Sequence, residues 1–207
     1  MMVTEKEFYD ALAGRIGKDE ACKLKSSTVG IAGLGGLGSN IAMMLARSGI
    51  GRLVIADDDT VELSNIHRQC YPLESIGMKK TDAVAMEINR VNPFCKVEKH
   101  DIRLNENNLN IFSECNIVCE AFDTAENKIM LIEGLSAMGK TVISGNGMAG
   151  KGSANSIVTR KVGDSIYICG DGISDVRKEG SLVPSRVIAC AAHQANAVIR
   201  IISGLEP

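Results

Sequence analysis

Residues 28–40 read TVGIAGLGGLGSN, a short apolar run followed by a glycine turn and the start of a helical pattern that continues from Ile41 to Arg47. Glycines at positions 33, 35 and 38 let the backbone turn tightly, approach a ligand without a Cβ atom, and pack a helix close to a strand. The free N–H groups at the start of such a helix face an anion. The stretch therefore predicts a strand, a turn and a helix built around a nucleotide phosphate.

The next apolar run supports this interpretation. Residues 52–56 predict a second strand, which ends in Asp57, Asp58 and Asp59. An acidic residue about twenty positions after the glycine turn is the group that holds ribose hydroxyls in such motifs. A Gly-x-Gly-x-x-Gly element alone is found in many protein classes, so the strand before it, the helix after it and Asp57 together favour a nucleotide site over a purely structural turn.

Further strands and helices alternate along the chain. A capping box of Thr4 and Glu7 predicts a first helix with Phe8, Leu12 and Ile16 on one face, which we expect Gly14 and Gly17 to interrupt. The later strands are predicted at 96–99, 116–121 and 140–144, the later helices at 79–91 and 125–138, a hairpin at 156–160 with 165–168, and a long helix at 187–202. This order predicts an α/β fold, with a Rossmann-like and mostly parallel sheet flanked by helices and with antiparallel C-terminal strands.

Composition narrows the class of protein. The 207 residues suit one domain over 1–207, because no linker-like stretch divides them. The net charge is -2 and the 23 Lys and Arg residues are dispersed, which argues against a nucleic-acid surface. Seven scattered cysteines suit a reducing compartment. Residues 1–10 do not resemble a signal peptide, and no run approaches the length of a membrane span. We expect a cytoplasmic protein that does not bind membranes.

The loop after the second strand carries a specific resemblance. Residues 57–69 read DDDTVELSNIHRQ and are similar to the Asp-x-Asp-x-Val-x-x-Ser-Asn-x-x-Arg-Gln motif of the ubiquitin-activating-enzyme superfamily, in its small ThiF/MoeB branch. Three further motifs follow in the same order as in that family: Gly77-x-x-Lys80, Val91-Asn92-Pro93 and Glu120-Ala121-Phe122-Asp123. Together they cover about residues 24–145, and the match is closest to the short ThiF-like proteins of thiamine synthesis.

The resemblance implies adenylation. In that family the C-terminal glycine carboxylate of a ubiquitin-like sulfur carrier attacks the α-phosphate of ATP, and gives an acyl adenylate and pyrophosphate. Arg68 and Lys80 are the implied phosphate contacts, and Asp123 is the implied ligand of Mg²⁺. The attacking carboxylate is already ionised, so no general base is required. The implied nucleotide-binding residues are Gly33, Gly35, Gly36, Gly38, Asp57, Asp59, Asn65 and Gln69.

Three departures from the family pattern limit what is carried over. The chain lacks the two Cys-x-x-Cys pairs that bind zinc in larger relatives, so we expect no zinc. Residues 170–184 contain no cysteine for a covalent intermediate, and we expect Cys169 to be buried. The N-terminal arginine motif that reaches a neighbouring subunit's ATP is missing, and Arg15 is the candidate to replace it. Residues 145–152 imitate a phosphate-binding P-loop, but Gly152 stands where Ser or Thr is needed.

The preferred hypothesis is an ATP- and Mg²⁺-dependent sulfur carrier protein adenylyltransferase of thiamine biosynthesis. The predicted partner is a carrier ending in Gly-Gly, and a homodimer is expected because the helix at 187–202 is apolar almost all round. Two alternatives stay open: another AMP-forming enzyme, such as a tRNA-modifying cyclising dehydratase, and a nucleotide-binding or carrier-docking module without turnover. A nicotinamide oxidoreductase ranks below these, because it has no need of the 57–69 motif.

Overall fold

The computed structural model describes residues 3–207; Met1 and Met2, the first residues of the predicted domain, lie outside this range. The main helices are α1 (Glu5–Ile16), α2 (Lys18–Ser26), α3 (Gly38–Arg47), α4 (Lys80–Val91), α5 (Ala125–Ala137), α6 (Val176–Glu179) and α7 (Pro184–Ile202). The strands are β1 (Thr28–Ala32), β2 (Arg52–Ala56), β3 (Lys96–His100), β4 (Ile117–Glu120), β5 (Thr141–Gly145), β6 (Val158–Gly163) and β7 (Ile166–Gly170).

All seven strands form one sheet in the order β3-β2-β1-β4-β5-β7-β6. The strands are parallel except β6, which runs antiparallel to β7. This confirms the predicted Rossmann-like fold class, including the antiparallel C-terminal pair. Since β1 lies between β2 and β4, the chain leaves β1 toward one side of the sheet and later returns to the other, and ligands bind at such a switch point in open α/β sheets.

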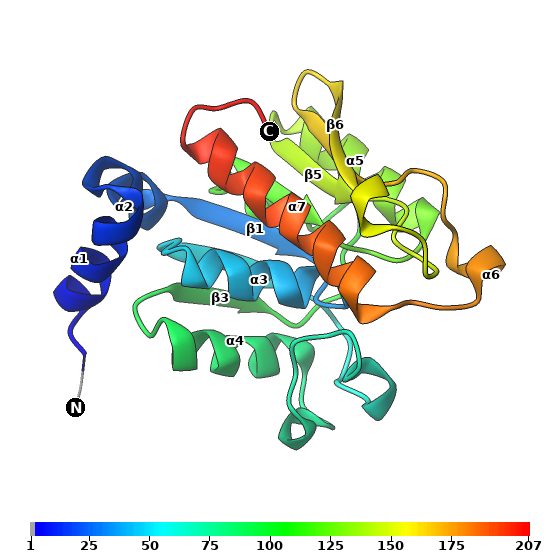
Figure 1. Ribbon diagram of the computed structural model, residues 1–207, viewed down its shortest axis with the longest axis horizontal. Helices are drawn as coiled ribbons and strands as arrows, with labels where there is room; N and C mark the ends of the chain where they lie inside the picture. Colours follow the sequence, from blue (N-terminus) through cyan, green and yellow to red (C-terminus); the bar gives the residue numbers. More distant parts are fainter. Residues whose placement is uncertain (1–2) are drawn as a thin grey trace.

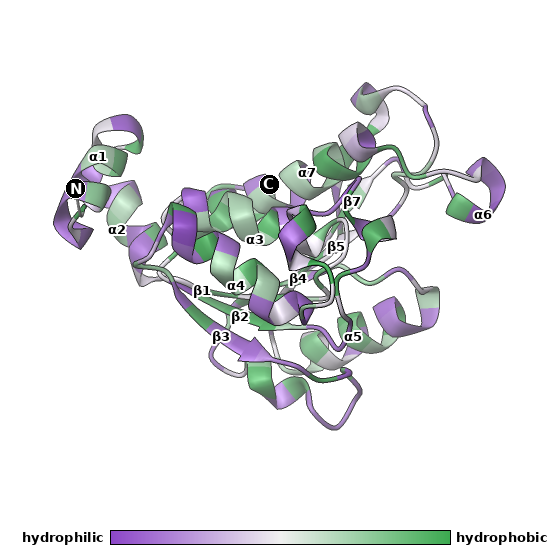
Figure 2. Cartoon of the chain, turned by 90° about the horizontal axis from the view of Figure 1, so that it is seen from below, coloured by the Kyte–Doolittle hydropathy of each residue, from purple (hydrophilic) through white to green (hydrophobic). Residues whose placement is uncertain are grey.

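The sheet is the middle of three layers (Figure 1). Helices α3, α4 and α7 cover one face, and α5 with the short turn Leu109–Phe112 covers the other. Alternate residues of β2 divide between the two cores: Leu53 and Ile55 pack toward α3, and Val54 and Ala56 pack toward Phe112. Apolar side chains therefore gather along the central strands, while the edge strand β3 is mostly hydrophilic in Figure 2.

The first helix differs from its prediction in one detail. Thr4 and Glu7 form the predicted capping box, but Gly14 lies inside α1 and only Gly17 ends it, with φ of 94°. Helix α2 then begins at Lys18, an element that the sequence reading did not include. Gly17 therefore separates two helices instead of ending one.

Helix α7 is largely covered within a single chain. It packs beside α3 and over the strands β5, β6 and β7, and Ser185, Ile188 and Asn196 are its exposed residues. The sheet and α3 therefore bury most of its apolar surface, while Ile188 stays 43% exposed. The homodimer itself stays a prediction.

Across residues 3–207 no helix is long and apolar enough to cross a membrane.

Candidate active site

Four loops at the carboxyl ends of β1, β2, β3 and β4 surround a cavity of about 490 Å³. The loops come from neighbouring strands on both sides of the switch point, as the parallel topology requires. The lining residues are Gly33, Gly35, Ala56, Asp57, Asp58, Asp59, Asn65, Arg68, Gln69, Lys80, Ile102, Arg103, Leu104, Ala121, Phe122, Asp123, Thr124 and Asn127. The cavity brings together all three predicted catalytic residues and six of the nine predicted nucleotide-binding residues.

The glycine loop is shaped by contacts that a side chain would prevent. Gly33 has φ of 89°, and a Cβ atom there would lie 3.0 Å from the carbonyl oxygen of Ala121. A Cβ at Gly38 would lie 1.8 Å from the carbonyl oxygen of Gly33, so this glycine allows α3 to start against the loop. At Gly35 the nearest atom is Gln69 Nε2 at 4.0 Å, and the open side is the cavity. Gly35 therefore offers its backbone to a ligand.

Gly36 and Gly38 serve packing and do not line the cavity. A Cβ at Gly36 would lie 2.9 Å from Val187 Cγ1 on α7. Next to it, Asn40 Nδ2 donates to the carbonyl oxygens of Gly36 at 2.7 Å and Arg68 at 2.9 Å. The start of α3 is thus tied to the loop that carries Arg68.

Asp57 is mostly buried and braces the glycine loop. Its Oδ2 accepts the backbone N–H of Leu34 at 2.6 Å, and its Oδ1 accepts the N–H of Asp59 at 2.8 Å. Lys80 Nζ lies 3.8 Å from Oδ1. Burial raises the pKa of Asp57 above its ordinary value, while Lys80 and the two backbone N–H groups oppose that rise. The predicted ribose contact of Asp57 stays a prediction.

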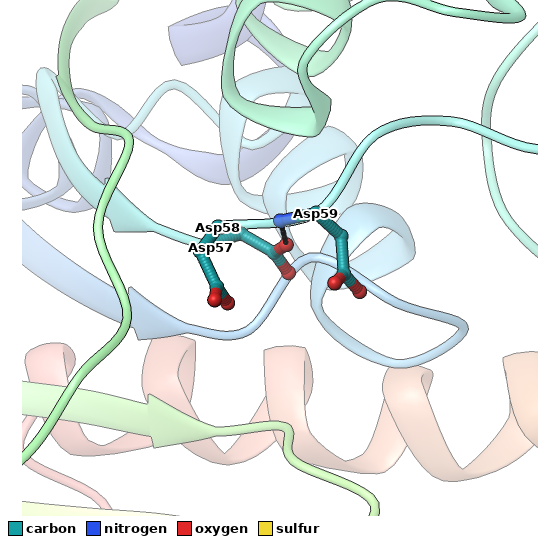
Figure 3. Close-up of side chains that lie close together, drawn as sticks. All are labelled: Asp57, Asp58 and Asp59. Carbon is teal, nitrogen blue, oxygen red and sulfur yellow. Dashed lines mark hydrogen bonds between the residues drawn. The ribbon is translucent and has the colours of Figure 1, made fainter.

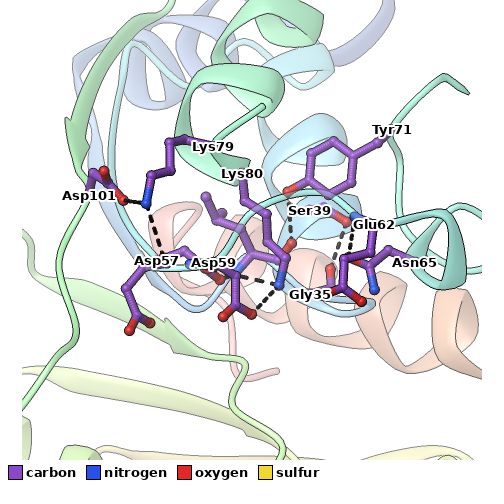
Figure 4. A network of polar contacts seen from close by, with 12 residues as sticks. Gly35, Ser39, Asp57, Asp59, Glu62, Asn65, Tyr71, Lys79, Lys80 and Asp101 are labelled. Atoms are coloured by element: carbon purple, nitrogen blue, oxygen red, sulfur yellow. Dashed lines mark hydrogen bonds and ion pairs between the residues drawn. The ribbon is translucent and has the colours of Figure 1, made fainter. Parts of the chain in front are cut away.

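Lys80, at the first turn of α4, points into the same group of carboxylates (Figure 4). Its side chain is only 7% exposed, and Nζ donates to Asp59 Oδ2 at 2.5 Å. The backbone N–H of Lys80 also donates to the carbonyl oxygen of Asp59 at 3.0 Å. The ammonium group is therefore held in place at the cavity before any ligand binds.

The loop that carries the 57–69 motif contributes three more polar side chains. Arg68 Nη1 donates to the carbonyl oxygen of Ser64 at 3.0 Å, which leaves most of its guanidinium donors for a ligand. Asn65 Oδ1 accepts the N–H of Glu62 at 3.1 Å. Gln69 is 7% exposed, and its Oε1 has no hydrogen-bond partner among residues 3–207. A buried acceptor without a partner at a cavity wall fits a ligand that donates to it.

Carboxylate oxygens suited to a hard cation lie at the cavity in two places. Asp57, Asp58 and Asp59 each offer an oxygen within 4.8 Å of the others (Figure 3). Asp123, the predicted metal ligand, is exposed and follows β4 across the cavity. Mg²⁺ prefers oxygen donors from one or two carboxylates and from substrate phosphates. The residues present therefore fit magnesium brought in with a nucleotide.

Arg15 is not brought to this cavity. It is exposed in the last turn of α1, which projects at the far end of the molecule from the loops that line the site (Figure 1). Its predicted role concerns a neighbouring subunit and stays a prediction.

The cysteines and the P-loop-like stretch lie elsewhere. Cys169 is buried as predicted, and burial raises its pKa to about 11. Residues 145–152 lead from β5 through a short turn into β6, so no helix follows them to receive a phosphate. A second hollow of about 500 Å³ lies at the amino ends of β1, β4 and β5, and among residues 3–207 the charged residues that line it are Lys23 and Glu114.

Comparison with known families agrees with this geometry. Residues 9–207 match the model of the ThiF family. The chain belongs to the ThiF family. Among curated proteins it is similar to the adenylyltransferase and sulfurtransferase Uba4 of Eremothecium gossypii, with 36% identity over 132 residues, which are 63% of this chain and 30% of the relative. Uba4 of Scheffersomyces stipitis is 33% identical over 165 residues, which are 72% of this chain and 37% of the relative. The chain thus spans about a third of these relatives.

Solved structures share the ThiF-family fold over a greater length. The E. coli tRNA N6-threonylcarbamoyladenosine dehydratase TcdA, in complex with AMP, has a TM-score of 0.86 at 18% identity and covers 99% of this chain and 98% of its own. E. coli MccB with ATP has a TM-score of 0.72 at 24% identity, over 96% of this chain and 62% of its own. At these identities the likeness concerns the fold.

Some cavity residues were not predicted from the ThiF-like motifs. Ile102, Arg103 and Leu104 follow β3, and Thr124 and Asn127 follow β4. The motifs did not include them, but the topology could have indicated them, because every loop at the carboxyl edge of a parallel sheet next to the switch point faces the ligand.

Proposed function

We propose that this ThiF-family chain is an ATP-dependent adenylyltransferase that activates the C-terminal glycine carboxylate of a ubiquitin-like sulfur carrier protein as an acyl adenylate. The observation that carries the proposal is the convergence of the open glycine loop at Gly35, the cations Arg68 and Lys80, and the carboxylate of Asp123 on one cavity. A nucleotide triphosphate needs these groups in one place, and a purely structural glycine turn does not.

The proposed reaction depends on positioning and charge. The glycine loop presents its backbone to the phosphates at Gly35, which lines the cavity. Arg68 contacts phosphate oxygens through two donors, and Lys80 supplies a point charge beside the α-phosphate. The carrier carboxylate is ionised at neutral pH, so it attacks phosphorus without a base while pyrophosphate leaves with its electron pair. The charge that develops on the phosphate oxygens is stabilised by these fixed cations.

Asp123 would hold Mg²⁺, which neutralises charge on the phosphates when bound. Asp57 would accept from the ribose hydroxyls at the end of β2, with Asp59, Asn65 and Gln69 around it. Arg15 would reach the site of a second copy in a homodimer. These roles, one domain over residues 1–207 and a cytoplasmic location are parts of the proposal.

The substrate is the finer part of the proposal. We propose a sulfur carrier ending in Gly-Gly as the substrate, because the net charge of -2 and the dispersed basic residues suit a protein partner more than a nucleic acid. Within this class we propose the carrier of thiamine synthesis first. The Uba4 relatives, named adenylyltransferase and sulfurtransferase, support a carrier of this class.

A second candidate is a tRNA-modifying cyclising dehydratase. The observation that favours it is the match to TcdA over nearly the whole length of both chains, whereas the Uba4 relatives are matched over about a third of theirs. This function would use the same cavity to adenylate a carboxylate on a modified tRNA.

ATP–pyrophosphate exchange separates these functions. With purified chain, MgATP and radiolabelled pyrophosphate, exchange that requires a carrier ending in Gly-Gly supports the proposal, and truncation of the final glycine should abolish it. Exchange that requires modified tRNA identifies the second candidate. Tight binding of MgATP without exchange for any substrate identifies a binding module, and a preference for NAD over ATP overturns the nucleotide assignment.

A further inference from the structure

A buried carboxylate lies beneath the cavity, three residues before Asp123. The Glu120 side chain is 0% exposed at the end of β4. Lys128 Nζ, in the first turns of α5, donates to Oε2 at 2.9 Å and to Oε1 at 3.1 Å. Ser144 Oγ, on β5, donates to Oε2 at 2.5 Å. The charge of Glu120 is therefore paired and hydrogen-bonded from two neighbouring elements.

The same carboxylate shapes the turn that leads to Asp123. Glu120 Oε1 accepts the backbone N–H of Phe122 at 2.6 Å, which bends the chain as it leaves β4. The bent segment packs against the glycine loop, since a Cβ at Gly33 would lie 3.1 Å from Phe122 Cδ1. Glu120 thus fixes the point from which Asp123 enters the cavity rim.

Lys128 extends this hold to the next strand and to the helix that follows Asp123. Its Nζ also donates to the carbonyl oxygen of Gly145 at 2.9 Å. From α7, Gln194 Nε2 donates to the carbonyl oxygens of Glu120 at 3.0 Å and Ile143 at 2.9 Å. The ends of β4 and β5 and the start of α5 therefore meet at one ion pair, with Asp123 between them.

A gain in folding stability does not explain the buried pair of Glu120 and Lys128. Replacing a buried ion pair by apolar groups of similar volume is often neutral or stabilising, because taking both charges out of water costs as much as their attraction returns. What Glu120 and Lys128 provide, and apolar groups cannot, is a set of directed hydrogen bonds to Phe122 and Gly145. Their contribution is to the geometry of the segment at 121–124.

We propose that Glu120 and Lys128 are positioning residues that hold the 121–124 turn so that the Asp123 carboxylate meets the magnesium of the bound nucleotide. The role of Asp123 in this inference rests on the proposed function, whereas the hold on the turn does not. Groups that orient a metal ligand commonly change metal affinity by about 10- to 100-fold when they are removed.

The test compares ATP binding with and without Mg²⁺ by calorimetry. The variant is the double substitution Glu120→Leu with Lys128→Met, which removes both charges and the acceptor of the Phe122 N–H and leaves no unpaired buried charge. We expect its Kd for MgATP to rise by about tenfold or more while its Kd for ATP in EDTA stays unchanged. Amide hydrogen exchange at Phe122 should become faster in the same variant. The single variant Lys128→Arg, which keeps the charge, should show wild-type MgATP affinity and wild-type hydrogen exchange at Phe122.

The matched control is Arg52→Met with Glu98→Gln, which neutralises an ion pair where β2 begins, at the opposite edge of the sheet. It should leave the effect of Mg²⁺ on ATP binding unchanged. The inference is overturned if the Glu120 and Lys128 double variant keeps the wild-type Kd for MgATP, or if it loses affinity equally with and without Mg²⁺. Equal loss would indicate general damage to the cavity.

Two other experimental results also bear on the inference. If the double variant does not fold, Lys128→Met alone carries the test, because it removes the ion pair and the hydrogen bond to Gly145: a selective loss of MgATP affinity supports the inference, and wild-type binding overturns it. If the wild-type chain binds no ATP, the proposed function fails, but Phe122 exchange still decides whether Glu120 and Lys128 hold the turn.

Discussion

The carboxylate of Asp57 accepts the backbone N–H of Leu34 at 2.6 Å, so the residue that follows β2 holds the loop that follows β1. The two residues are 23 positions apart in the sequence, and they meet because β1 and β2 are paired in parallel, with Ala32 opposite Ala56. The glycine loop is therefore set in place by a neighbouring strand as well as by its own backbone.

The first prediction concerns this brace. Asp57→Asn replaces the charged acceptor by an amide and removes a partner of Lys80. The free energy of unfolding should fall by about 1 to 3 kcal/mol, the cost of an unsatisfied buried group. Urea unfolding measures this. Asp82→Asn, in an exposed pair with Lys99, should change stability by about 0.5 kcal/mol or less. Equal effects from the two substitutions would argue against the brace.

Two glycine substitutions separate folding from ligand access. Gly35→Ala places a methyl group toward the cavity, where the nearest atom is 4.0 Å away, so the melting temperature should stay close to wild type while ATP affinity falls. Gly38→Ala places its methyl group 1.8 Å from the carbonyl oxygen of Gly33, so the fold itself should be destabilised. Thermal unfolding and calorimetry measure both effects. Unchanged ATP affinity in Gly35→Ala would contradict the proposed backbone contact.

Substitutions of the assigned site residues and substitutions of the cysteines should have opposite effects on pyrophosphate exchange. Arg68→Ala should lower pyrophosphate exchange by about ten- to a hundredfold, because it removes a charge-assisted contact worth about 1.5 to 3 kcal/mol. Asp123→Ala should lower exchange at least as much. Cys169→Ser and Cys70→Ser should leave exchange nearly intact, since no thiol is needed for a carboxylate to attack phosphorus. Loss of exchange in folded Cys169→Ser would reopen a covalent mechanism.

The buried thiols predict a loss of stability at alkaline pH. Burial raises the pKa of Cys95, Cys115 and Cys190 to about 12, from 9.0 in the unfolded chain. Above pH 9 the unfolded chain releases protons that the folded chain keeps, so stability falls as pH rises toward 12. Each thiol should cost about 1 kcal/mol by pH 10. Urea midpoints at pH 8 and pH 10 measure the loss, and replacing Cys115 by Ala should reduce the difference between them.

The sequence was sufficient for the strands that have clear limits. β1 and β2 match their predictions at both ends, because each is a short apolar run that stops at a glycine or at charged residues. The hairpin of β6 and β7 was placed within two or three residues, since the turn at Val162-Gly163-Asp164 marks its centre. Helix α2 was missed because its apolar residues, Ala21 and Leu24, are too few to give a helical periodicity.

The residues of the site likewise divide into those that a local motif predicts and those that it does not. Motif residues such as Arg68, Lys80 and Asp123 were predicted and lie at one cavity. The pairing of Lys80 with Asp59 was not predicted, because a contact between side chains 21 positions apart depends on how α4 docks against α3 and β3. Buried Glu120 was seen only as part of a motif. Its partners Lys128 and Ser144 come from separate elements and carry no local pattern that would link them.

Lys80 and Asp59 also belong to the charged residues that line the cavity. Its lining holds three cations, Arg68, Lys80 and Arg103, and four carboxylates, Asp57, Asp58, Asp59 and Asp123, which leaves a formal balance of one negative charge. A bare phosphate ion would meet a lining of net negative charge in which Lys80 is already paired with Asp59. A nucleotide that arrives with its own divalent cation carries less negative charge than the free nucleotide, so we expect the cavity to favour the magnesium complex over the free nucleotide.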